Sequence, residues 1–365
     1  MADKTEITDE YDDIALIDGE DGEAYASPMF SVEDLLNADM PLDGGELTRT
    51  EKRRRMRSIR VSKALFRAID IVFNKSQNTC PYVNRKNAGT IKRTKDIVYD
   101  ESAKDVCRMD VYRVKSESKQ PAVIYIHGGG FTAGGREYRK GQSQFFALNG
   151  FTVFCIDYGL SPAYTYPEPL KHIVNAANFI YDHADEYNID RDRIMVAGDS
   201  AGGYYAAMLG AFNCGGALAD AFGFAPKFRI FGALLICGLY DMETVLQTKY
   251  ALDIDDAVFL SLTGVREDEF EAFAYKHACE PIGFVDRNYP PAFIMYAERD
   301  LFCKGQGEIF SQKLNDCGVY FESYSARHAT SNHCFSLNWR GEDATAANEL
   351  MMSFAKRLAA GKIVL

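Results

Sequence analysis

The hydrophobic pattern of the chain alternates between short, unbroken apolar runs and longer stretches in which apolar residues recur at helical spacing. The apolar runs are residues 122–126, 152–156, 193–197, 231–239 and 292–296, and a further strand is expected at 320–324. Runs of this length are typical of parallel strands that are buried on both faces. The helical stretches are residues 142–148, 170–187, 202–212, 307–317 and 343–360. Strands that alternate with helices predict an α/β fold with a mostly parallel, doubly wound sheet.

Two regions break this alternation. Residues 94–99 and 107–114 alternate loosely between polar and apolar positions, which predicts an antiparallel pair of strands ahead of the parallel ones. Residues 241–285 carry no strand signal, and helical pieces dominate them. We interpret this segment as an insertion that forms part of a helical cap. The main domain is then expected at 91–240 and 286–365.

The charge changes sign near residue 50. Residues 1–50 hold fifteen Asp or Glu against two Lys or Arg, with few apolar positions in register, so disorder or loose packing is expected. Residues 51–74 instead place apolar side chains at helical spacing between bases. Such a helix can lie on an anionic membrane surface. The simpler interpretation is a cap helix within a region at 51–90, with its bases facing water or the acidic segment.

The composition narrows the class of protein. A formal charge of −11 argues against general nucleic-acid binding, and no run approaches the roughly 20 apolar residues of a membrane span. The first residues, MADKTEITDE, lack the basic and apolar regions of a secretory signal. Nine cysteines without CxxC or metal-like pairing predict reduced, mostly buried thiols, which suit a cytoplasmic protein.

A candidate nucleophile lies in the segment GDSAGG at 198–203, between an apolar strand and a helical stretch. In this context the GxSxG pattern predicts a sharp strand-to-helix turn that exposes the Ser200 hydroxyl above the carboxyl edge of the sheet. Gly198 and Gly202 are expected there because side chains at these positions would collide with the neighbouring strand and helix. The helix that follows directs its positive end at the site.

A second motif, HGGGF at 127–131, directly follows the first parallel strand. Acyl transfer develops negative charge on a carbonyl oxygen, which backbone N–H groups can stabilise, and glycine leaves room for a substrate beside them. We therefore predict an oxyanion hole formed by the N–H groups of Gly128, Gly129 and Ala201. A phosphate cradle fits poorly, because the segment has neither a GK[ST] ending nor GxGxxG spacing. His127 is expected to shape the loop rather than to act as a base.

A serine nucleophile needs a base and an acid that orients the base. In α/β folds that hold the serine on such a strand-to-helix turn, they follow along the chain in the order Ser, acid, His. Asp300 comes just after a late apolar strand and is the preferred acid, ahead of Glu298 and Asp241. Two histidines follow the last predicted strand. His333 lies nearer the final helix than His328 and is the preferred base.

These motifs, together with the segments YAERD at 296–300 and HCF at 333–335, resemble the hormone-sensitive-lipase-like family of α/β-hydrolase esterases over roughly residues 90–360. The resemblance implies an α/β-hydrolase fold with a helical cap. It also implies a triad of Ser200, Asp300 and His333, and the same oxyanion donors. A homodimer edge at the last strand and C-terminal helix is common in proteins that resemble this one.

The chain also departs from the family pattern. The segment DYGLSP at 157–162 resembles the family's YRLAPE block, but Gly159 stands where Arg is usual, so a salt bridge made by that residue is absent or rebuilt. Tyr204 and Tyr205 follow GDSAGG where smaller or aliphatic residues are usual, and residues 301–303 replace the usual Pro-Leu. None of these changes removes a reacting group, so they bear on substrate preference.

We therefore expect a serine carboxylesterase that hydrolyses short-chain or aromatic esters of small molecules through an acyl-enzyme, without a metal or organic cofactor. Phe131, Tyr204 and Tyr205 lie close in sequence to the reacting groups and are expected to line the pocket. Deacetylation of a sugar or drug-like molecule, and amide or peptide hydrolysis, use the same triad and stay open. A hydrolase-fold protein that binds a ligand without turnover is the alternative from another class.

Overall fold

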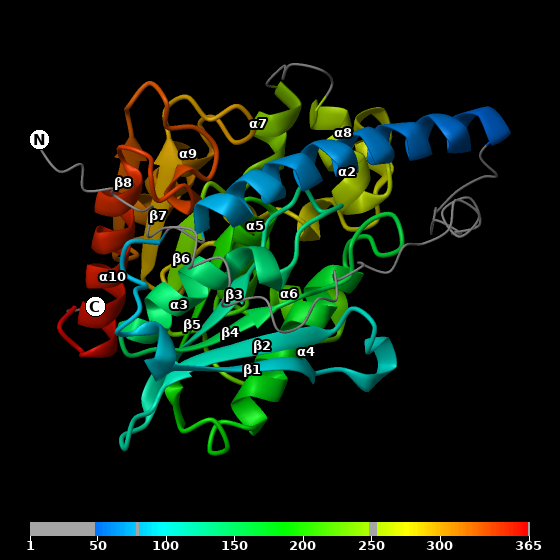
Figure 1. The fold of residues 1–365 in the computed structure, drawn as a ribbon. Coiled ribbons are helices and arrows are strands. Elements are labelled where there is room, and N and C mark those ends of the chain that lie inside the picture. Colours follow the sequence, from blue (N-terminus) through cyan, green and yellow to red (C-terminus); the bar gives the residue numbers. More distant parts are fainter. Residues whose placement is uncertain (1–47, 78–79, 248–253, 364–365) are drawn as a thin grey trace, which may run out of the picture. The chain divides into compact units, whose positions relative to one another are not determined.

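The computed structural model of the protein describes residues 48–77, 80–247 and 254–363. Within them, one sheet has the strand order β1-β2-β4-β3-β5-β6-β7-β8 (Figure 1). The strands are β1 (Ile91–Val98), β2 (Arg108–Val114), β3 (Gln120–Ile126), β4 (Thr152–Ile156), β5 (Ile189–Asp199), β6 (Ala233–Ile236), β7 (Ala292–Ala297) and β8 (Phe321–Ala326). β2 is antiparallel to both neighbours, β1 and β4, and all other pairs are parallel. The predicted antiparallel pair and mostly parallel sheet are confirmed.

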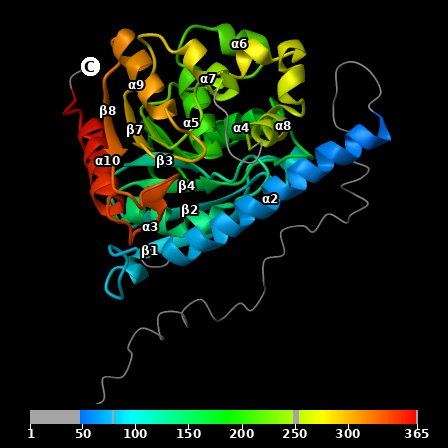
Figure 2. The same cartoon turned by 90° about the horizontal axis from the view of Figure 1, so that it is seen from above.

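Successive residues of the central strand β3 belong to two different cores. Ile124 packs in the core on one face of the sheet and Tyr125 in the core on the other. The helices of the first face are α4 (Glu168–Asp182), α5 (Ala201–Ala211), α6 (Ala217–Phe222) and α9 (Gln306–Asp316). Those of the second face are α3 (Lys140–Leu148) and α10 (Ala344–Ala359). The sheet lies between these two layers (Figure 2), which is the doubly wound arrangement that the sequence predicts.

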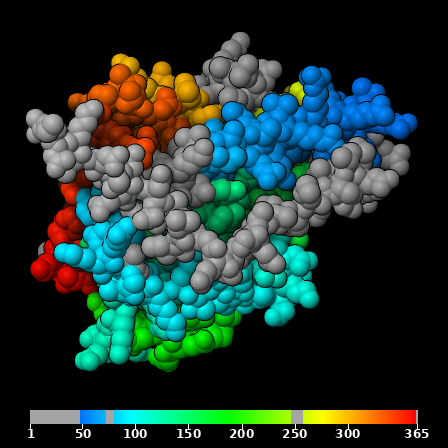
Figure 3. All heavy atoms as spheres, viewed as in Figure 1, coloured from blue at the N-terminus to red at the C-terminus, as the bar shows by residue number. Residues whose placement is uncertain are grey.

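The remaining helices come from the N-terminal region and from the segment at 241–285. They are α2 (Arg49–Gln77), α7 (Met242–Gln247) and α8 (Ile254–Thr263), with the 3₁₀ turns η6 (Glu267–Ala272), η7 (Lys276–Ala278) and η8 (Pro281–Phe284). α2 packs against α8 and against η4 (Arg136–Arg139). Its other side lies at the surface of the molecule (Figure 3). The described residues of 241–285 contain no strand, as expected.

Arg55 ties α2 to the 241–285 segment. Its guanidinium is 1 % exposed, donates to the carbonyl of Gly264 at 3.3 Å and pairs with Glu269. Of the acidic segment at 1–50, only residues 48–50 belong to the described part of the chain. In the ranges that the structure describes, no helix is both long and apolar enough to cross a membrane.

The register of the parallel strands brings the two sequence motifs together. Ile126, the last residue of β3, lies opposite Gly198 of β5. The loop that begins at His127 therefore starts beside the turn that holds Ser200. In the same way Ala297 of β7 lies opposite Ala326 of β8. The loops after these strands, which carry the candidate acid and base, meet at the same edge of the sheet.

Candidate active site

Ser200 lies at the sharp turn between β5 and α5. Its backbone has φ 53° and ψ −120°, a conformation that is rare for a residue other than glycine. A Cβ on Gly198 would lie 2.2 Å from the carbonyl oxygen of Gly202, and one on Gly202 would lie 2.1 Å from the carbonyl oxygen of Ile126. The strand, turn and helix are packed too closely for side chains at either glycine. The glycines expected at these two positions are thereby confirmed.

Ser200, His333 and Asp300 form a continuous chain of hydrogen bonds, which we call the candidate triad. The Oγ atom of Ser200 lies 2.8 Å from Nε2 of His333. On the other side of the ring, Nδ1 of His333 lies 2.9 Å from each carboxylate oxygen of Asp300. A carboxylate only accepts hydrogen bonds, so Nδ1 carries a proton, and in the neutral ring Nε2 is then free to accept the proton of Ser200.

Asp300 is held in its ionised form. Burial by itself would raise the pKa of this carboxyl, which is 3 % exposed. The interaction with His333 and the backbone N–H groups of Phe302 and Cys303, each 2.8 Å from Oδ1, outweigh burial and hold the pKa below its usual value. Asp300 is therefore a fixed negative charge that orients the imidazole.

The other acids and bases that the sequence offered lie elsewhere. Glu298 pairs with Arg327 at 2.8 Å on the surface. Asp241 accepts from the hydroxyl and the N–H of Thr244 at the start of α7. His328 is exposed and contacts Thr330 through Nδ1 at 2.9 Å. None of these side chains contacts Ser200.

One predicted oxyanion donor is occupied. The N–H of Gly128 donates to Oδ2 of Asp199 at 3.1 Å, so the prediction that it faces an oxyanion does not agree with the structure. The sequence locates a glycine loop but does not fix where each amide points. Gly129 lines the cavity at Ser200. Ala201 is the first residue of α5, so its N–H has no partner within the helix.

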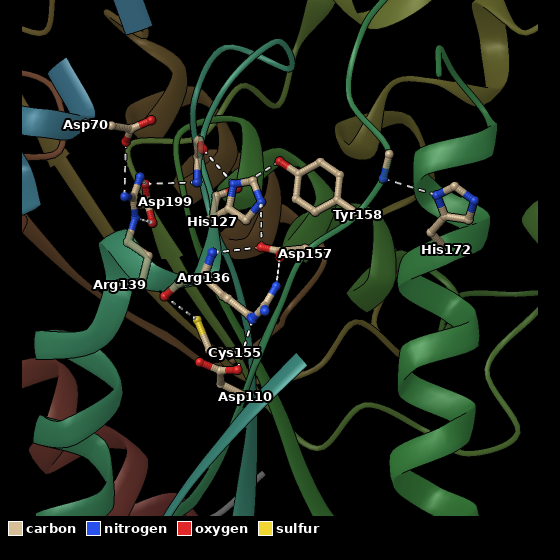
Figure 4. A network of polar contacts seen from close by, with 12 residues as sticks. Asp70, Asp110, His127, Arg136, Arg139, Cys155, Asp157, Tyr158, His172 and Asp199 are labelled. Atoms are coloured by element: carbon tan, nitrogen blue, oxygen red, sulfur yellow. Dashed lines mark hydrogen bonds and ion pairs between the residues drawn. The ribbon is translucent and has the colours of Figure 1, made fainter. Parts of the chain in front are cut away.

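His127 has the structural role that the sequence predicts. Its buried ring stacks on Tyr158 with centroids 4.5 Å apart, and its Nδ1 donates to the carbonyl of Gly128 at 2.8 Å (Figure 4). Burial lowers the pKa of His127, although Asp157 acts in the opposite direction. The hydroxyl of Tyr158 donates to the carbonyl of His127 at 2.8 Å. These contacts fix the loop through a neutral imidazole.

Asp157 obtains a cation from another part of the chain. Gly159 supplies no cation, and its N–H donates to Nδ1 of His172 at 3.2 Å. Arg136 instead pairs with Asp157 and with Asp110, and its backbone N–H donates to Asp157 at 2.8 Å (Figure 4). Arg136 of η4 thus supplies the cation that is absent at Gly159, and the salt bridge is rebuilt from another part of the chain.

A second set of charges lies between α2 and the Ser200 turn. Arg139 is 1 % exposed and binds both oxygens of Asp199, at 2.7 and 2.8 Å, and one oxygen of Asp70, at 3.1 Å (Figure 4). We call Asp70, Arg139 and Asp199 the ion cluster. Asp199 also accepts from Tyr125 at 3.2 Å. Together with the Gly128 contact, the ion cluster links α2 to the glycine loop and to the residue before Ser200.

The cavity at Ser200 is narrow and receives side chains from α2. Its lining residues are Phe66, Ile69, Asp70, Gly129, Arg139, Asp199, Ser200, His333 and Cys334. Phe66 contacts Phe302 with ring centroids 5.6 Å apart, and Phe302 contacts the His333 ring at 5.0 Å. Phe66 and Ile69 both belong to the apolar positions that the sequence predicts for a cap helix at 51–74, none of which was assigned to the pocket.

The predicted pocket residues are core residues instead. Phe131, Tyr204 and Tyr205 are 3 %, 0 % and 1 % exposed, and their rings pack edge to face. Tyr204 donates to the carbonyl of Cys279 at 2.8 Å. The prediction rested on proximity in sequence to the reacting groups. Tyr204 and Tyr205 belong to α5, which is buried along its whole length, and none of the three side chains lines the cavity at Ser200.

Three buried thiols surround the base. Ligand atoms of Cys237, Cys334 and His333 lie within 4.8 Å of one another, as do those of Asp300, Cys303 and His333. Thiolate and imidazole suit zinc, but both ring nitrogens of His333 already contact Ser200 or Asp300, so a metal here would break the candidate triad. All nine cysteines are free and eight are buried, as predicted.

The parallel sheet with helices on both faces and the serine at a strand-to-helix turn define an α/β-hydrolase. A model of the BD-FAE family matches residues 109–314. The match covers more than half of the chain, and the chain belongs to this family. It includes the glycine loop, Ser200 and Asp300.

Curated relatives and solved structures agree with this class. The acetyl esterase of Salmonella paratyphi B is 32 % identical over 199 residues, covering 50 % of this chain and 56 % of the relative. That of Salmonella choleraesuis is 31 % identical over 194 residues, with the same coverage. The chain thus spans just over half the length of the curated relatives that it matches.

Two esterase structures share the fold. Esterase B of Lactobacillus rhamnosis has a TM-score of 0.73 at 18 % identity, covering 86 % of this chain and 98 % of that one. The esterase of Pyrobaculum calidifontis has a TM-score of 0.63 at 22 % identity, covering 84 % and 94 %. The expected α/β-hydrolase fold and the relationship to esterases of this fold are confirmed.

Proposed function

We propose that the protein is a serine hydrolase that cleaves carboxylic esters with short acyl groups through an acyl-enzyme. The observation that carries the proposal is the hydrogen-bonded chain from Ser200 through His333 to Asp300, with distances of 2.8 and 2.9 Å. Nucleophile, base and orienting acid lie within hydrogen-bond reach of one another, which is the geometry that nucleophilic catalysis by serine requires.

The residues divide the reaction among them. His333 Nε2 takes the proton of Ser200 while Oγ attacks the ester carbonyl, and the N–H groups of Gly129 and Ala201 stabilise the oxyanion. His333 then gives its proton to the departing alkoxide, which leaves as the alcohol. A water molecule loses a proton to His333 and attacks the acyl-enzyme, and Ser200 recovers the proton as the acid is released. Asp300 stays ionised throughout and holds the ring.

The preference for short acyl groups has two supports. The cavity beside Ser200 is narrow, and Phe66 and Ile69 of α2 close one side of it. The curated relatives are named acetyl esterases, and one structure of esterase B from Lactobacillus rhamnosis is inhibited by a tributyrin phosphonate. A series of nitrophenyl esters of increasing acyl length tests this point. We expect the highest kcat/KM for acyl groups of about two to four carbons. A maximum at long chains would contradict it.

Labelling with a fluorophosphonate tests the reaction class. We expect mass spectrometry to find the adduct on Ser200, and no adduct on the Ser200→Ala variant. Ser311→Ala, a serine substitution on α9, is the matched control and is expected to react like the wild type. A wild-type protein that binds esters but neither reacts with the phosphonate nor turns over would be a ligand-binding member of the fold, and the proposal would fail.

A further inference from the structure

The Asp70 carboxylate is buried beside Ser200 with only one of its oxygens bound. Asp70 is 2 % exposed and lines the same cavity as Ser200 and His333. Its Oδ1 atom accepts from Arg139 at 3.1 Å. Its Oδ2 atom has no hydrogen-bond partner among the described residues. In Figure 4 one oxygen points to Arg139 and the other points away from it.

The charges of the ion cluster do not balance at Asp70. Two carboxylates share one guanidinium, which leaves one negative charge. Asp199 receives four hydrogen bonds, two from Arg139 and one each from Tyr125 and Gly128, so its oxygens are satisfied. The uncompensated charge therefore lies on Asp70. Burial raises the pKa of the Asp70 carboxyl, and the nearby Asp199 acts in the same direction, although Arg139 acts to lower it.

A buried acceptor without a partner favours a ligand that brings a donor. We propose that Asp70 determines specificity by accepting a hydrogen bond, through Oδ2, from a hydroxyl group that the substrate carries close to its ester. This inference rests on the proposed function. A neutral hydroxyl loses less solvation than an ammonium group on entering a cavity that Phe66 and Ile69 also line, so the hydroxyl is the chemistry that the site fits.

The test compares hydroxyl esters with their methyl ethers, which keep the oxygen but lose the donor. One pair places the group on the alcohol side, 2-hydroxyethyl acetate against 2-methoxyethyl acetate. The other places it on the acyl side, ethyl glycolate against ethyl methoxyacetate. In the wild type we expect kcat/KM to favour the hydroxyl ester of one pair at least about tenfold, because a site built for a donor discriminates strongly against analogues without it.

Asp70→Asn keeps the shape of the side chain, but its free end can present an N–H donor in place of the carboxylate acceptor. We expect the hydroxyl-to-methoxy ratio to fall to within about threefold of one in this variant. A residue that only anchors α2 would lower kcat/KM for all four esters alike and leave the ratio unchanged.

Glu51→Gln is the matched control. Glu51 is another α2 carboxylate bound to an arginine, Arg55 at 3.4 Å, but it lies about 28 Å away along the helix at the usual rise per residue. The hydroxyl-to-methoxy ratio of kcat/KM in Glu51→Gln should equal that of the wild type.

Wild-type ratios near one in both ester pairs overturn the inference even if Asp70→Asn does not fold. A ratio that Asp70→Asn leaves unchanged overturns it as well. If Ser200 labels but these ratios are flat, only this inference fails. If no ester is hydrolysed and Ser200 does not label, the proposed function fails with it.

Discussion

Two polar clusters meet beside the carboxyl ends of β3 and β5, and they are built in opposite ways. The candidate triad is a chain, in which each group contacts the next at 2.8 or 2.9 Å. The ion cluster is compact, with Arg139 at its centre and carboxylates on two sides. The triad comes from three loops at one edge of the sheet. The ion cluster joins that edge to α2.

The difference lies in what each cluster does with protons. In the candidate triad the Ser200 hydroxyl can pass its proton to the His333 imidazole near neutral pH, while Asp300 stays ionised and orients the ring. A guanidinium keeps its proton in any folded protein, so the ion cluster cannot do so. We therefore expect substitutions in the triad to change turnover while the fold persists. Substitutions in the ion cluster should change the free energy of unfolding.

The largest effect is expected from Ser200→Ala. Removing the hydroxyl eliminates the nucleophile, so kcat for ester hydrolysis should fall about 10⁴-fold or more. The free energy of unfolding should stay close to that of the wild type, because alanine keeps the Cβ and therefore the same strained backbone conformation as Ser200. Steady-state kinetics and urea unfolding measure the two quantities. Substantial residual turnover would remove Ser200 from its proposed role.

Arg139→Met should show the opposite behaviour. It leaves two carboxylates buried without a cation, which costs about 3–5 kcal/mol of unfolding free energy. Urea unfolding monitored by circular dichroism measures the change. Arg191→Met is the control, because its ion pair with Asp185 is exposed and contributes at most about 1 kcal/mol. Equal losses in the two variants would show that the ion cluster is no more important than a surface pair.

The two clusters also differ in how far the sequence predicted them. Ser200, Asp300 and His333 each follow a local pattern, an apolar strand and then a loop, and the order of the chain limits the choice. Asp70 pairs with Arg139 at a separation of 69 residues. On a helix rich in bases, an acid is expected to face solvent or a neighbouring base. Only the docking of α2 reveals the buried contact.

The wrong predictions have the same origin. Gly128 lies in the expected loop, but its amide is turned to Asp199 by contacts that the sequence does not encode locally. Tyr204 and Tyr205 are close to Ser200 along the chain, yet each residue of a helix is rotated by about 100° from the one before. Proximity in sequence therefore did not predict a place in the cavity, which side chains of α2 line instead.

Phe66→Ala separates the two contacts of α2, because Phe66 packs on Phe302 beside the candidate triad while Asp70 binds Arg139 in the ion cluster. The ring is 5 % exposed, so its loss should cost about 3 kcal/mol of unfolding free energy. It also opens the cavity, so the preferred acyl group of nitrophenyl esters should become longer. Val61→Ala, on the outer side of α2 at 64 % exposure, should change neither quantity. An unchanged acyl preference in Phe66→Ala would show that this ring does not limit the substrate.

The smallest effect is expected at Glu137, which lies in η4 between Arg136 and Arg139. Burial, with Asp157 adding to it, raises the pKa of Glu137 to about 7. The unfolded chain releases this proton near pH 4.5, whereas the native state keeps it until about pH 7. The native state therefore binds more protons in this interval, and its stability falls as the pH rises through it. The stability that the protonated form contributes is fully present below the unfolded pKa and is lost above the folded one.

Glu137→Gln keeps a neutral side chain at every pH and should remove this loss. We expect the variant to match the wild type near pH 4.5 and to exceed it by about 1–2 kcal/mol at pH 8, after allowance for solvent screening of a partly exposed group. Urea unfolding at half-unit steps of pH measures the difference. Glu117→Gln, an exposed residue between β2 and β3, should give a curve parallel to the wild type. If Glu137→Gln is also parallel, Glu137 is ionised in the native state and the cations of η4 stabilise it more than burial destabilises it.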